Sequence, residues 1–293
     1  MEKQILRQEA PQNDISELKE VPLSRITLDY PEELVRIILL CAGYATRLYP
    51  LTENQPKPLL SVGGRPILEW ILDSLKGIPG ISGVYAVTNH KFAGHFETWA
   101  KTLSYDWKVE TVDDGTTSNE NRLGAIGDLN YVLQKKKIGA EDLLVVAGDN
   151  FFDFDLSKFL KEVKARRPYP VIAVYDVKDI ELAKEYGLVK IDPQGRVIEF
   201  FEKPKNPPTT LASCGLYWLP AETRVLLDKY LRDGHNSDQP GHYMKWLAEQ
   251  ARGGGQAGLM AVALEGHWLD IGDRKSYDKA NASYSEFNHP KGK

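Results

Sequence analysis

The sequence has few cysteines, little charge of either sign in excess and no long apolar segment, and each absence excludes a class of protein. Only Cys41 and Cys214 are cysteines among 293 residues, so a disulfide framework is excluded and a reducing, cytoplasmic setting is expected. Lys and Arg number 37 against 41 Asp and Glu, a net charge of −4 that does not favour nucleic-acid binding. No apolar run approaches the about 20 residues that span a membrane, and the polar residues 1–20 exclude a signal-peptide core.

The first residues differ in character from the rest of the chain. Residues 1–35 are rich in charge and hold only small apolar clusters, so we expect an N-terminal extension. It either packs as a short helix and strand, makes an oligomer contact or stays loose. The remainder, residues 36–293, contains no linker long enough to divide it and no internal repeat, which predicts a single domain.

Apolar patterning along this domain alternates between strand and helix. Short apolar runs typical of buried strands occur at 36–40, 84–88, 107–112, 143–147 and 171–175. Helical spacing occurs between them, at 66–75, 92–103 and 123–133. This order predicts an α/β sheet with crossover helices. The later part predicts a hairpin over 188–201, strands at 213–219 and 259–264, and helices at 224–231, 242–251 and 275–287.

A loop rich in small residues follows the first expected strand, and it contains the densest chemistry of the sequence. Residues 42–46 read Ala-Gly-Tyr-Ala-Thr, Arg47 comes next, and Lys57 stands inside the run Pro-Lys-Pro. Backbone N–H groups of such a loop can approach phosphate oxygens, while an arginine fork and a lysine point charge suit a triphosphate. The loop has neither the dinucleotide fingerprint nor the Walker A pattern. As isolated side chains, both cations could equally be solvated residues of an ordinary turn.

The longer pattern resembles the sugar-phosphate nucleotidyltransferases, also called nucleotide-sugar pyrophosphorylases, in particular those of the glucose-1-phosphate thymidylyl- or uridylyltransferase kind. That family carries G-x-G-T-R-L-x-P-L-T, then P-K-P-L-L, then G-[RK]-P-[IM]-[IL]-[ED]. The matching residues here are Gly43, 46–48, 50–52, 56–58 and 64–69. The resemblance extends over 36 to about 280 and implies a Rossmann-like, three-layer α/β fold, with helices on both faces of a mixed, mainly parallel sheet.

The resemblance also implies roles for the residues of this loop. Arg47 and Lys57 hold the triphosphate and stabilise charge during transfer, and the nucleotide is bound by Ala42, Gly43, Tyr44, Ala45 and Thr46. One residue departs from the family pattern, because Ala45 stands where the family usually has glycine. If the loop needs a positive φ there, alanine costs about 1 kcal/mol.

Two aspartates follow apolar runs far apart in the sequence. Asp149 ends the strand expected at 143–147, and Asp270 follows an apolar pair after Trp268. Each alone could be a turn or helix-capping residue. Brought together by the fold, they could hold one Mg²⁺ with phosphate oxygens and water. The resemblance covers both positions through its G-D and W-x-D-x-G patterns, and it implies that Asp149 and Asp270 are the metal pair, with Asp149 also beside the nucleotide.

The remaining motifs concern the sugar and the base. Glu202 can accept hydrogen bonds from sugar hydroxyls and Lys203 can pair with a phosphate, although both could also form a surface ion pair. The family uses this E-K-P motif and a preceding Y-G for the sugar 1-phosphate. The resemblance therefore implies sugar-phosphate binding by the following residues: Gly187, Glu202, Lys203, Cys214 and Trp268. Gly124 matches the family glycine whose backbone approaches the nucleobase. The side chain that selects the base has no clear match.

These observations predict an Mg²⁺-dependent transfer of a nucleotidyl group from an NTP to a sugar 1-phosphate, with Lys203 joining Arg47 and Lys57 in catalysis. The expected partners are these two small-molecule substrates, and neither nucleic acid nor a membrane is expected. Assembly into a homo-oligomer is left open. Two rivals stay open. One is a cytidylyltransferase for a non-sugar phosphate such as a phosphorylated amino alcohol. The other is a non-catalytic nucleotide-sugar sensor, suggested by Ala45 and by the unusual N-terminus.

Overall fold

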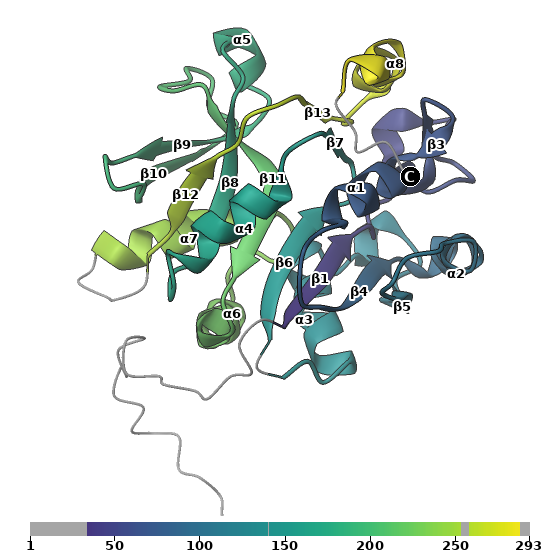
Figure 1. Cartoon of the computed structure of the whole chain (residues 1–293), viewed down its shortest axis with the longest axis horizontal. Coiled ribbons are helices and arrows are strands. Elements are labelled where there is room, and N and C mark those ends of the chain that lie inside the picture. Colours follow the sequence, from purple (N-terminus) through teal and green to yellow (C-terminus); the bar gives the residue numbers. More distant parts are fainter. Residues whose placement is uncertain (1–33, 140, 253–257, 288–293) are drawn as a thin grey trace, which may run out of the picture.

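A computed structural model describes residues 34–139, 141–252 and 258–287 of the chain (Figure 1). The helix and strand considered for the N-terminal extension therefore lie outside the described part. Val35, the last residue assigned to that extension, is the first residue of the first strand. Within the described part, nine strands join in one sheet whose main order is β10-β9-β11-β6-β1-β4-β5, while β8 pairs with β11 and β12. These strands are β1 (Val35–Leu40), β4 (Ile81–Thr88), β5 (Val109–Asp113), β6 (Asp142–Ala147), β8 (Val171–Asp176), β9 (Gly187–Ile191), β10 (Val197–Glu202), β11 (Leu211–Leu219) and β12 (Met260–Ala263).

The centre of the sheet is parallel, as the continuous apolar runs predict. β1 lies between β4 and β6 in parallel register on both sides, and β4 continues in parallel to β5. β11 then enters antiparallel to β6, and the hairpin of β9 and β10 extends the sheet at that end. The mixed, mainly parallel sheet of the sequence analysis is confirmed. The carboxyl ends of the parallel strands consequently meet at one edge, where α/β proteins bind ligands.

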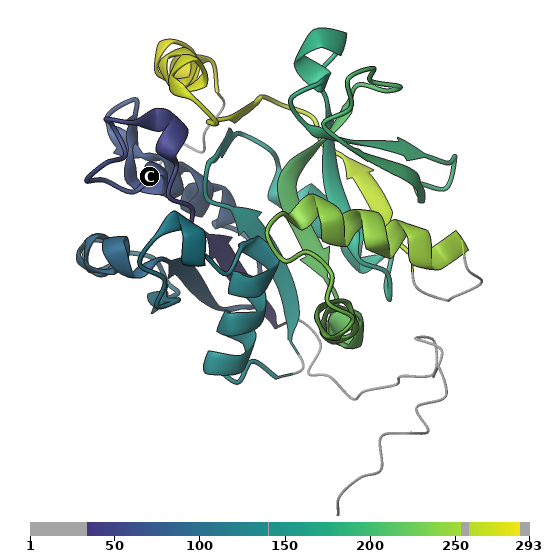
Figure 2. The same ribbon diagram turned by 180° about the vertical axis from the view of Figure 1, so that it is seen from behind.

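Helices cover both faces of the sheet because its buried strands have two apolar faces. Ile37 and Leu39 of β1 belong to one core cluster, whereas Ile38 between them belongs to the other. Figures 1 and 2 show the two helical layers from opposite sides. The first layer contains α1 (Ile67–Leu75), α2 (Ala93–Ala100) and α4 (Leu156–Lys164). The second contains α3 (Ala125–Lys135), α6 (Arg224–Arg232) and α7 (Pro240–Arg252).

The expected elements all occur, with shifts of a few residues at their ends. The helix expected over 92–103 is a 3-10 turn followed by the shorter α2, and the closing helix is α8 (Arg274–Ser283) with a 3-10 turn after it. The sequence analysis did not identify α4. Its signal was nevertheless present, because Asp155 caps the helix by accepting from two backbone N–H groups, and Phe159 and Val163 lie buried on one face. The short α5 (Ile180–Ala183) was also missed.

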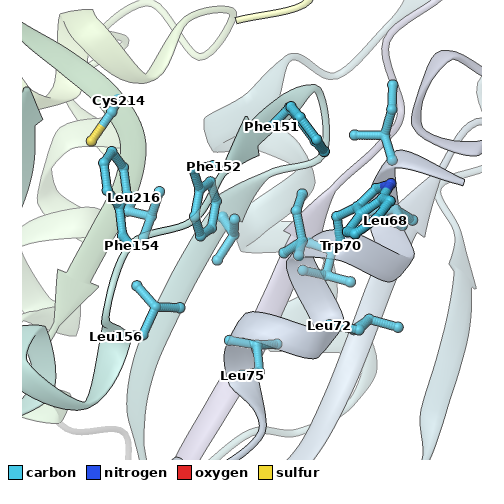
Figure 3. Close-up of a cluster of buried hydrophobic side chains, with 14 of the residues drawn as sticks. Leu68, Trp70, Leu72, Leu75, Phe151, Phe152, Phe154, Leu156, Cys214 and Leu216 are labelled. Carbon is cyan, nitrogen blue, oxygen red and sulfur yellow. The ribbon is translucent and has the colours of Figure 1, made fainter. Parts of the chain in front are cut away.

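Two short strands outside the main sheet bring the end of the domain back to the carboxyl edge. β7 (Asn150–Phe152) follows β6 directly and pairs antiparallel with β13 (Trp268–Asp270). β7 is anchored by aromatic packing, since the rings of Phe151 and Trp70 form a T-shaped contact with their centroids 5.7 Å apart (Figure 3). A further two-stranded ribbon, β2 (Ser61–Val62) with β3 (Arg65–Pro66), precedes α1.

None of the helices in the described ranges combines the length and the apolar character that crossing a membrane requires.

Gly215 offers a test of the packing between β11 and β7. It has φ +70°, and an added Cβ would lie 2.5 Å from Asn150 Nδ2. Gly234 has a similar φ of +75° with open space around it. We expect Gly234→Ala to lower the free energy of unfolding by about 1–2 kcal/mol, the backbone cost alone. Gly215→Ala should cost about 1–3 kcal/mol more, because of overpacking. Urea unfolding of both variants measures the difference, and equal losses would contradict the close approach.

Candidate functional site

The loop after β1 is held at its start by the end of β4. The N–H of Cys41 donates to the carbonyl of Val87 at 2.9 Å, which prolongs the strand pairing by one residue. Asn89, fully buried, donates from Nδ2 to the carbonyl of Ala42 at 2.9 Å and accepts the N–H of Phe92 through Oδ1. Sequence reasoning did not identify Asn89 as a support of the loop. Its signal was a polar residue directly after an apolar strand.

The turn of the loop contains a left-handed alanine. Ala45 has φ 49° and ψ 41°, and its carbonyl accepts hydrogen bonds from the Oγ1 of the buried Thr52 at 2.7 Å and from the N–H of Leu48. The condition raised by the sequence is therefore met, because the loop does need a positive φ at this position. The hydrogen bond from Thr52 helps to hold alanine in this strained conformation. Thr46 and Arg47 follow, exposed, on a 3-10 turn.

Lys57 joins three distant parts of the chain. Its Nζ donates to Asp149 Oδ2 at 2.6 Å and to the carbonyl of Ile271 at 3.0 Å. Only 13% of the Lys57 side chain is exposed, compared with 31% of Asp149. Partial burial reduces solvent screening, so this ion pair is stronger than an ordinary surface pair. The contact places the cation of the P-K-P motif beside the carboxylate at the end of β6, as the sequence predicted for a common site.

Of the two predicted aspartates, Asp149 lies in the turn between β6 and β7, and Asp270 is the last residue of β13. β7 and β13 align Asn150 with Asp270, and the N–H of Ile271 donates to the carbonyl of Asp149 at 3.0 Å. Burial raises the pKa of the Asp270 carboxyl to about 6, and the charge of Asp149 contributes to the rise. The charges of three cations act against the rise, those of Lys57, Lys203 and Arg47. The structure thus brings together the five charged residues that were predicted to hold phosphates and metal.

The paired carboxylates fit a divalent cation. Repulsion between Asp149 and Asp270 is relieved when a positive ion lies between or beside them. In the described ranges no group of three or more His, Cys, Asp and Glu side chains could hold a metal ion. Two carboxylates alone leave most positions of an octahedral Mg²⁺ open, which is the usual arrangement where substrate phosphates and water supply the other ligands.

Asn150 and Trp268 position Asp149. The indole N–H of Trp268 donates to Asn150 Oδ1 at 2.7 Å, and Asn150 Nδ2 reaches Asp149 Oδ1 at 3.3 Å. The Trp268 ring also packs on Tyr186, with ring centroids 4.8 Å apart. Asn150 was not predicted as a site residue, although it directly follows the G-D pair. Trp268 thus contacts both Asn150 and Tyr186, the residue directly before β9. Its contact with a sugar stays a prediction.

Three of the five residues predicted for the sugar phosphate lie on the β9–β10 hairpin or directly after it: Gly187, Glu202 and Lys203. Gly187 stands opposite Glu202, and an added Cβ there would lie 2.8 Å from the Phe200 ring and 3.3 Å from Glu202 Oε2. Lys203 is exposed, has φ 43° and donates its N–H to the carbonyl of Tyr186. A lysine in this conformation is strained, a feature concentrated at functional positions. The pKa of Glu202 is raised by burial, against the opposing charge of Lys203.

Cys214 lies apart from these polar residues. Its side chain is fully buried on β11, and Sγ donates to the carbonyl of Ala173 at 3.3 Å. Burial holds the pKa of the Cys214 thiol far above its usual value, so it stays neutral. The side chain therefore packs in the core, and any contact with a sugar would have to come from its backbone.

Gly124 begins α3 with φ +79° and lies against the segment that precedes α7. An added Cβ would be 2.4 Å from Asp238 Cα, and the N–H of Ala125 donates to the carbonyl of Asp238 at 2.9 Å. Glycine is thus required by both conformation and space. On the other side of this loop, Tyr44 OH lies 3.5 Å from Thr116 Oγ1, which connects it to the loop after β1, the predicted phosphate-binding loop. The segment around Asp238 was not predicted, because only the tertiary fold brings it here.

Comparison with known proteins gives a consistent picture. A family model described as nucleotidyl transferase matches residues 36–286. The bifunctional protein GlmU of Methanocaldococcus jannaschii is 28% identical over 235 residues, 80% of this chain and 50% of that protein. A glucose-1-phosphate adenylyltransferase of Ruminiclostridium cellulolyticum is 29% identical over 258 residues, 83% of this chain and 58% of that protein. The chain therefore spans about half the length of these relatives.

A solved structure shares the fold. It is assigned as a glucose-1-phosphate thymidylyltransferase from Bacillus anthracis in complex with a sucrose, and it superimposes with a TM-score of 0.71 at 22% identity. The match covers 88% of this chain and 98% of the other. At this identity the likeness concerns the architecture alone, and it agrees with the mixed α/β sheet described above.

The strained Ala45 predicts a stabilising substitution. Glycine adopts φ 49° without the steric cost that alanine pays, so Ala45→Gly should raise the free energy of unfolding by up to about 1 kcal/mol. Lys137→Gly, at φ 50° after α3, is the matched control outside the loop and should gain a similar amount. Thermal or urea unfolding measures both. A loss of stability confined to Ala45→Gly would contradict a strained alanine in this loop.

Proposed function

Because the chain belongs to the nucleotidyl transferase family, we propose that it transfers a nucleotidyl group from an NTP to a sugar 1-phosphate, releasing pyrophosphate. The observation that carries the proposal is the gathering of Lys57, Asp149 and Asp270 at the carboxyl edge of the sheet, with Arg47 and Lys203 electrostatically coupled to them. Relatives named as glucose-1-phosphate adenylyltransferase support a sugar phosphate as the acceptor. The proposed site draws on residues from Ala42 to Asp270, which supports treating 36–293 as one catalytic domain.

In the proposed reaction, an oxygen of the sugar 1-phosphate attacks the α-phosphorus of the NTP. A new P–O bond forms there, and the bond to the β-phosphate breaks with its electron pair leaving on pyrophosphate. The attacking phosphate is already ionised at neutral pH, so no general base is required. The chain then contributes position and positive charge. Arg47 and Lys57 hold the triphosphate and the departing pyrophosphate, and Lys203 holds the sugar phosphate.

Asp149 and Asp270 would hold Mg²⁺. When bound, the ion would neutralise triphosphate charge and favour in-line geometry. Lys57 and Asn150 orient Asp149 through its two carboxylate oxygens, so the chain itself fixes one ligand before any ion arrives. On the sugar side, Glu202 is positioned to accept hydrogen bonds from hydroxyl groups, because it forms no ion pair among the described residues and its carboxylate lies between β9 and the first turn of α7.

A panel of substrates tests the proposal directly. The protein is incubated with Mg²⁺, each of ATP, GTP, CTP, UTP and dTTP, and several sugar 1-phosphates, and released pyrophosphate is measured. The reverse panel uses pyrophosphate with ADP-, GDP-, CDP-, UDP- and dTDP-sugars. Turnover with at least one pair, abolished by chelation of Mg²⁺, is expected. NTP binding without turnover in either direction would favour the nucleotide-sugar sensor instead.

Arg47→Ala should lower kcat by about 10²–10³-fold, since it removes a charge that stabilises the departing pyrophosphate. The control is Arg196→Ala, which breaks only the exposed ion pair with Asp192 at the tip of the β9–β10 hairpin. Such surface pairs contribute little, so the control should keep its activity. Initial rates of pyrophosphate release at saturating substrate compare the two, and an Arg47 variant as active as the control would remove this residue from the mechanism.

Glu202→Ala should raise the KM for the sugar 1-phosphate about tenfold or more with a smaller change in kcat, because it removes hydroxyl contacts made in the ground state as well as the transition state. Glu199→Gln, on the exposed face of the same strand beside Lys190, is the matched control and should change neither constant. An unchanged KM in Glu202→Ala, with activity on a phosphorylated amino alcohol and CTP, would favour the cytidylyltransferase rival.

A further inference from the structure

Two buried carboxyl groups flank the loop that precedes α3 and have no role in the proposed chemistry. Asp114 follows β5 and is 7% exposed, while Asp128 lies in the first turn of α3 and is 5% exposed. The two side chains are hydrogen-bonded to each other. Among the described residues, Asp128 Oδ1 has no hydrogen-bond partner. A buried carboxylate in this situation would be costly unless it carried a proton.

The hydrogen bonds indicate where that proton lies. Two carboxyl groups can bond to each other only if one of them donates. Asp114 Oδ1 accepts the N–H of Thr116 at 2.6 Å, a bond that favours the ionised form of Asp114. Among the described residues, Asp128 Oδ1 has no such donor. Burial raises the pKa of both carboxyls, and with the added charge of Asp114 it raises that of Asp128 to about 8. Asp128 is therefore the acid of the pair at neutral pH.

The charged and titratable groups facing this pair are mostly acidic. Asp238, from the segment before α7, and Asp113, at the end of β5, both add negative charge. Asp238 is paired with Arg122 in a two-pronged contact at 2.8 and 3.0 Å, which occupies that cation. The thiol of Cys41, in the loop after β1, lies within the electrostatic influence of Asp128. Burial raises the pKa of this thiol well above its usual value, so the thiol is neutral. No cation is available in these contacts to replace the proton.

The pair is connected to both sides of the candidate nucleotide site. Through Thr116, Asp114 reaches Tyr44 of the phosphate-binding loop, at 3.5 Å between the two hydroxyl oxygens. Through its own N–H, Asp128 donates to the carbonyl of Gly124 at 2.7 Å. The hydrogen bond between the two carboxyl groups thus joins the beginning and the end of the segment 114–124, which lies between the phosphate-binding loop and the glycine matched to the base.

We propose that Asp114 and Asp128 share one proton, carried by Asp128, and that this acid–carboxylate contact positions the segment 114–124 for NTP binding. Both are positioning residues. The inference rests on the proposed function for the identity of the ligand. When Asp128 gives its proton to hydroxide, the two carboxylates repel each other at contact distance, the segment loses its connection and NTP binding weakens. Asparagine at position 128 keeps a hydrogen-bond donor of similar shape but has no titratable proton. Leucine at this position has neither a donor nor a titratable proton.

The test compares wild type, Asp128→Asn and Asp128→Leu between pH 6.5 and 9.5, with Asp233→Asn as a control in an exposed pair with Lys229. The Kd is measured by titration with ATP, GTP, CTP, UTP and dTTP in the presence of Mg²⁺, and KM and kcat follow for the active substrates. The wild-type Kd should rise by up to about tenfold per pH unit above pH 8, the limit for loss of one proton. Asp128→Asn should show no such rise, and Asp128→Leu should bind about tenfold or more weakly at every pH.

The stability of the fold gives an independent measurement. A carboxyl whose pKa is raised on folding binds its proton more tightly in the folded state, so its contribution to stability is complete below about pH 4 and is lost as pH rises to about 8. The free energy of unfolding of Asp128→Asn, relative to wild type, should therefore increase across this window and level off above it. This result does not depend on NTP binding or on Asp128→Leu being folded.

The outcomes separate the inference from the proposed function. Turnover by the wild type with the same pH response of Kd in wild type and Asp128→Asn would overturn the inference and leave the function intact. Binding of an NTP with the expected difference between these two proteins, but without turnover on any acceptor, would overturn the function alone. No binding of any NTP by the wild type would overturn both.

Discussion

The pairing of β7 with β13 is the constraint on which the candidate site depends. It aligns Asn150 with Asp270 and so joins residues 120 positions apart, at the edge where the parallel strands end. The pairing is short, and three hydrogen-bonded residues a side would not be stable alone. Phe151 packing on Trp70 beneath, and the indole of Trp268 bonded to Asn150, supply the missing stability. The core packing thus fixes the spacing of two like charges at the surface.

Much of this arrangement could be predicted from sequence because its signals are local. The apolar runs of β1, β4 and β6 identify strands buried on both faces, and polar residues directly after them fall at a common edge. Ala45 could be singled out because it stands where the family usually has glycine, and the structure shows the left-handed backbone that this departure made conditional. Arg47, Lys57, Asp149 and Asp270 were identified by motif, whereas the proximity of Asp270 to the others depends on the pairing of β7 with β13.

The supports of the site could not be predicted in the same way. Asn89 and Asn150 hold the backbone and carboxylate of other residues, and which partner each one meets depends on the packing of β4, β7 and β13. Asp238 lies against Gly124 although 114 residues separate them, and no periodicity predicts that contact. α4 is a different case, because its N-cap residue and its apolar face are both recognisable from the local sequence. Tertiary hydrogen bonds are therefore the part of the site that sequence patterns do not contain.

Two pairs of neighbouring aspartates in the described part of the chain, Asp149 with Asp270 and Asp114 with Asp128, have surroundings that give them opposite chemistry. The charges of Lys57, Lys203 and Arg47 offset part of the cost of burying Asp270, and we propose Asp149 and Asp270 as metal ligands. Asp114 and Asp128 face further acidic groups, one of which, Asp238, is bound to Arg122. In our proposal, a shared proton removes the repulsion between Asp114 and Asp128. A carboxyl pair with cations and access to phosphate is suited to binding a metal ion, whereas a buried pair without them is suited to sharing a proton and fixing the backbone. The distribution of arginine and lysine around each pair, rather than the aspartates themselves, decides between these roles.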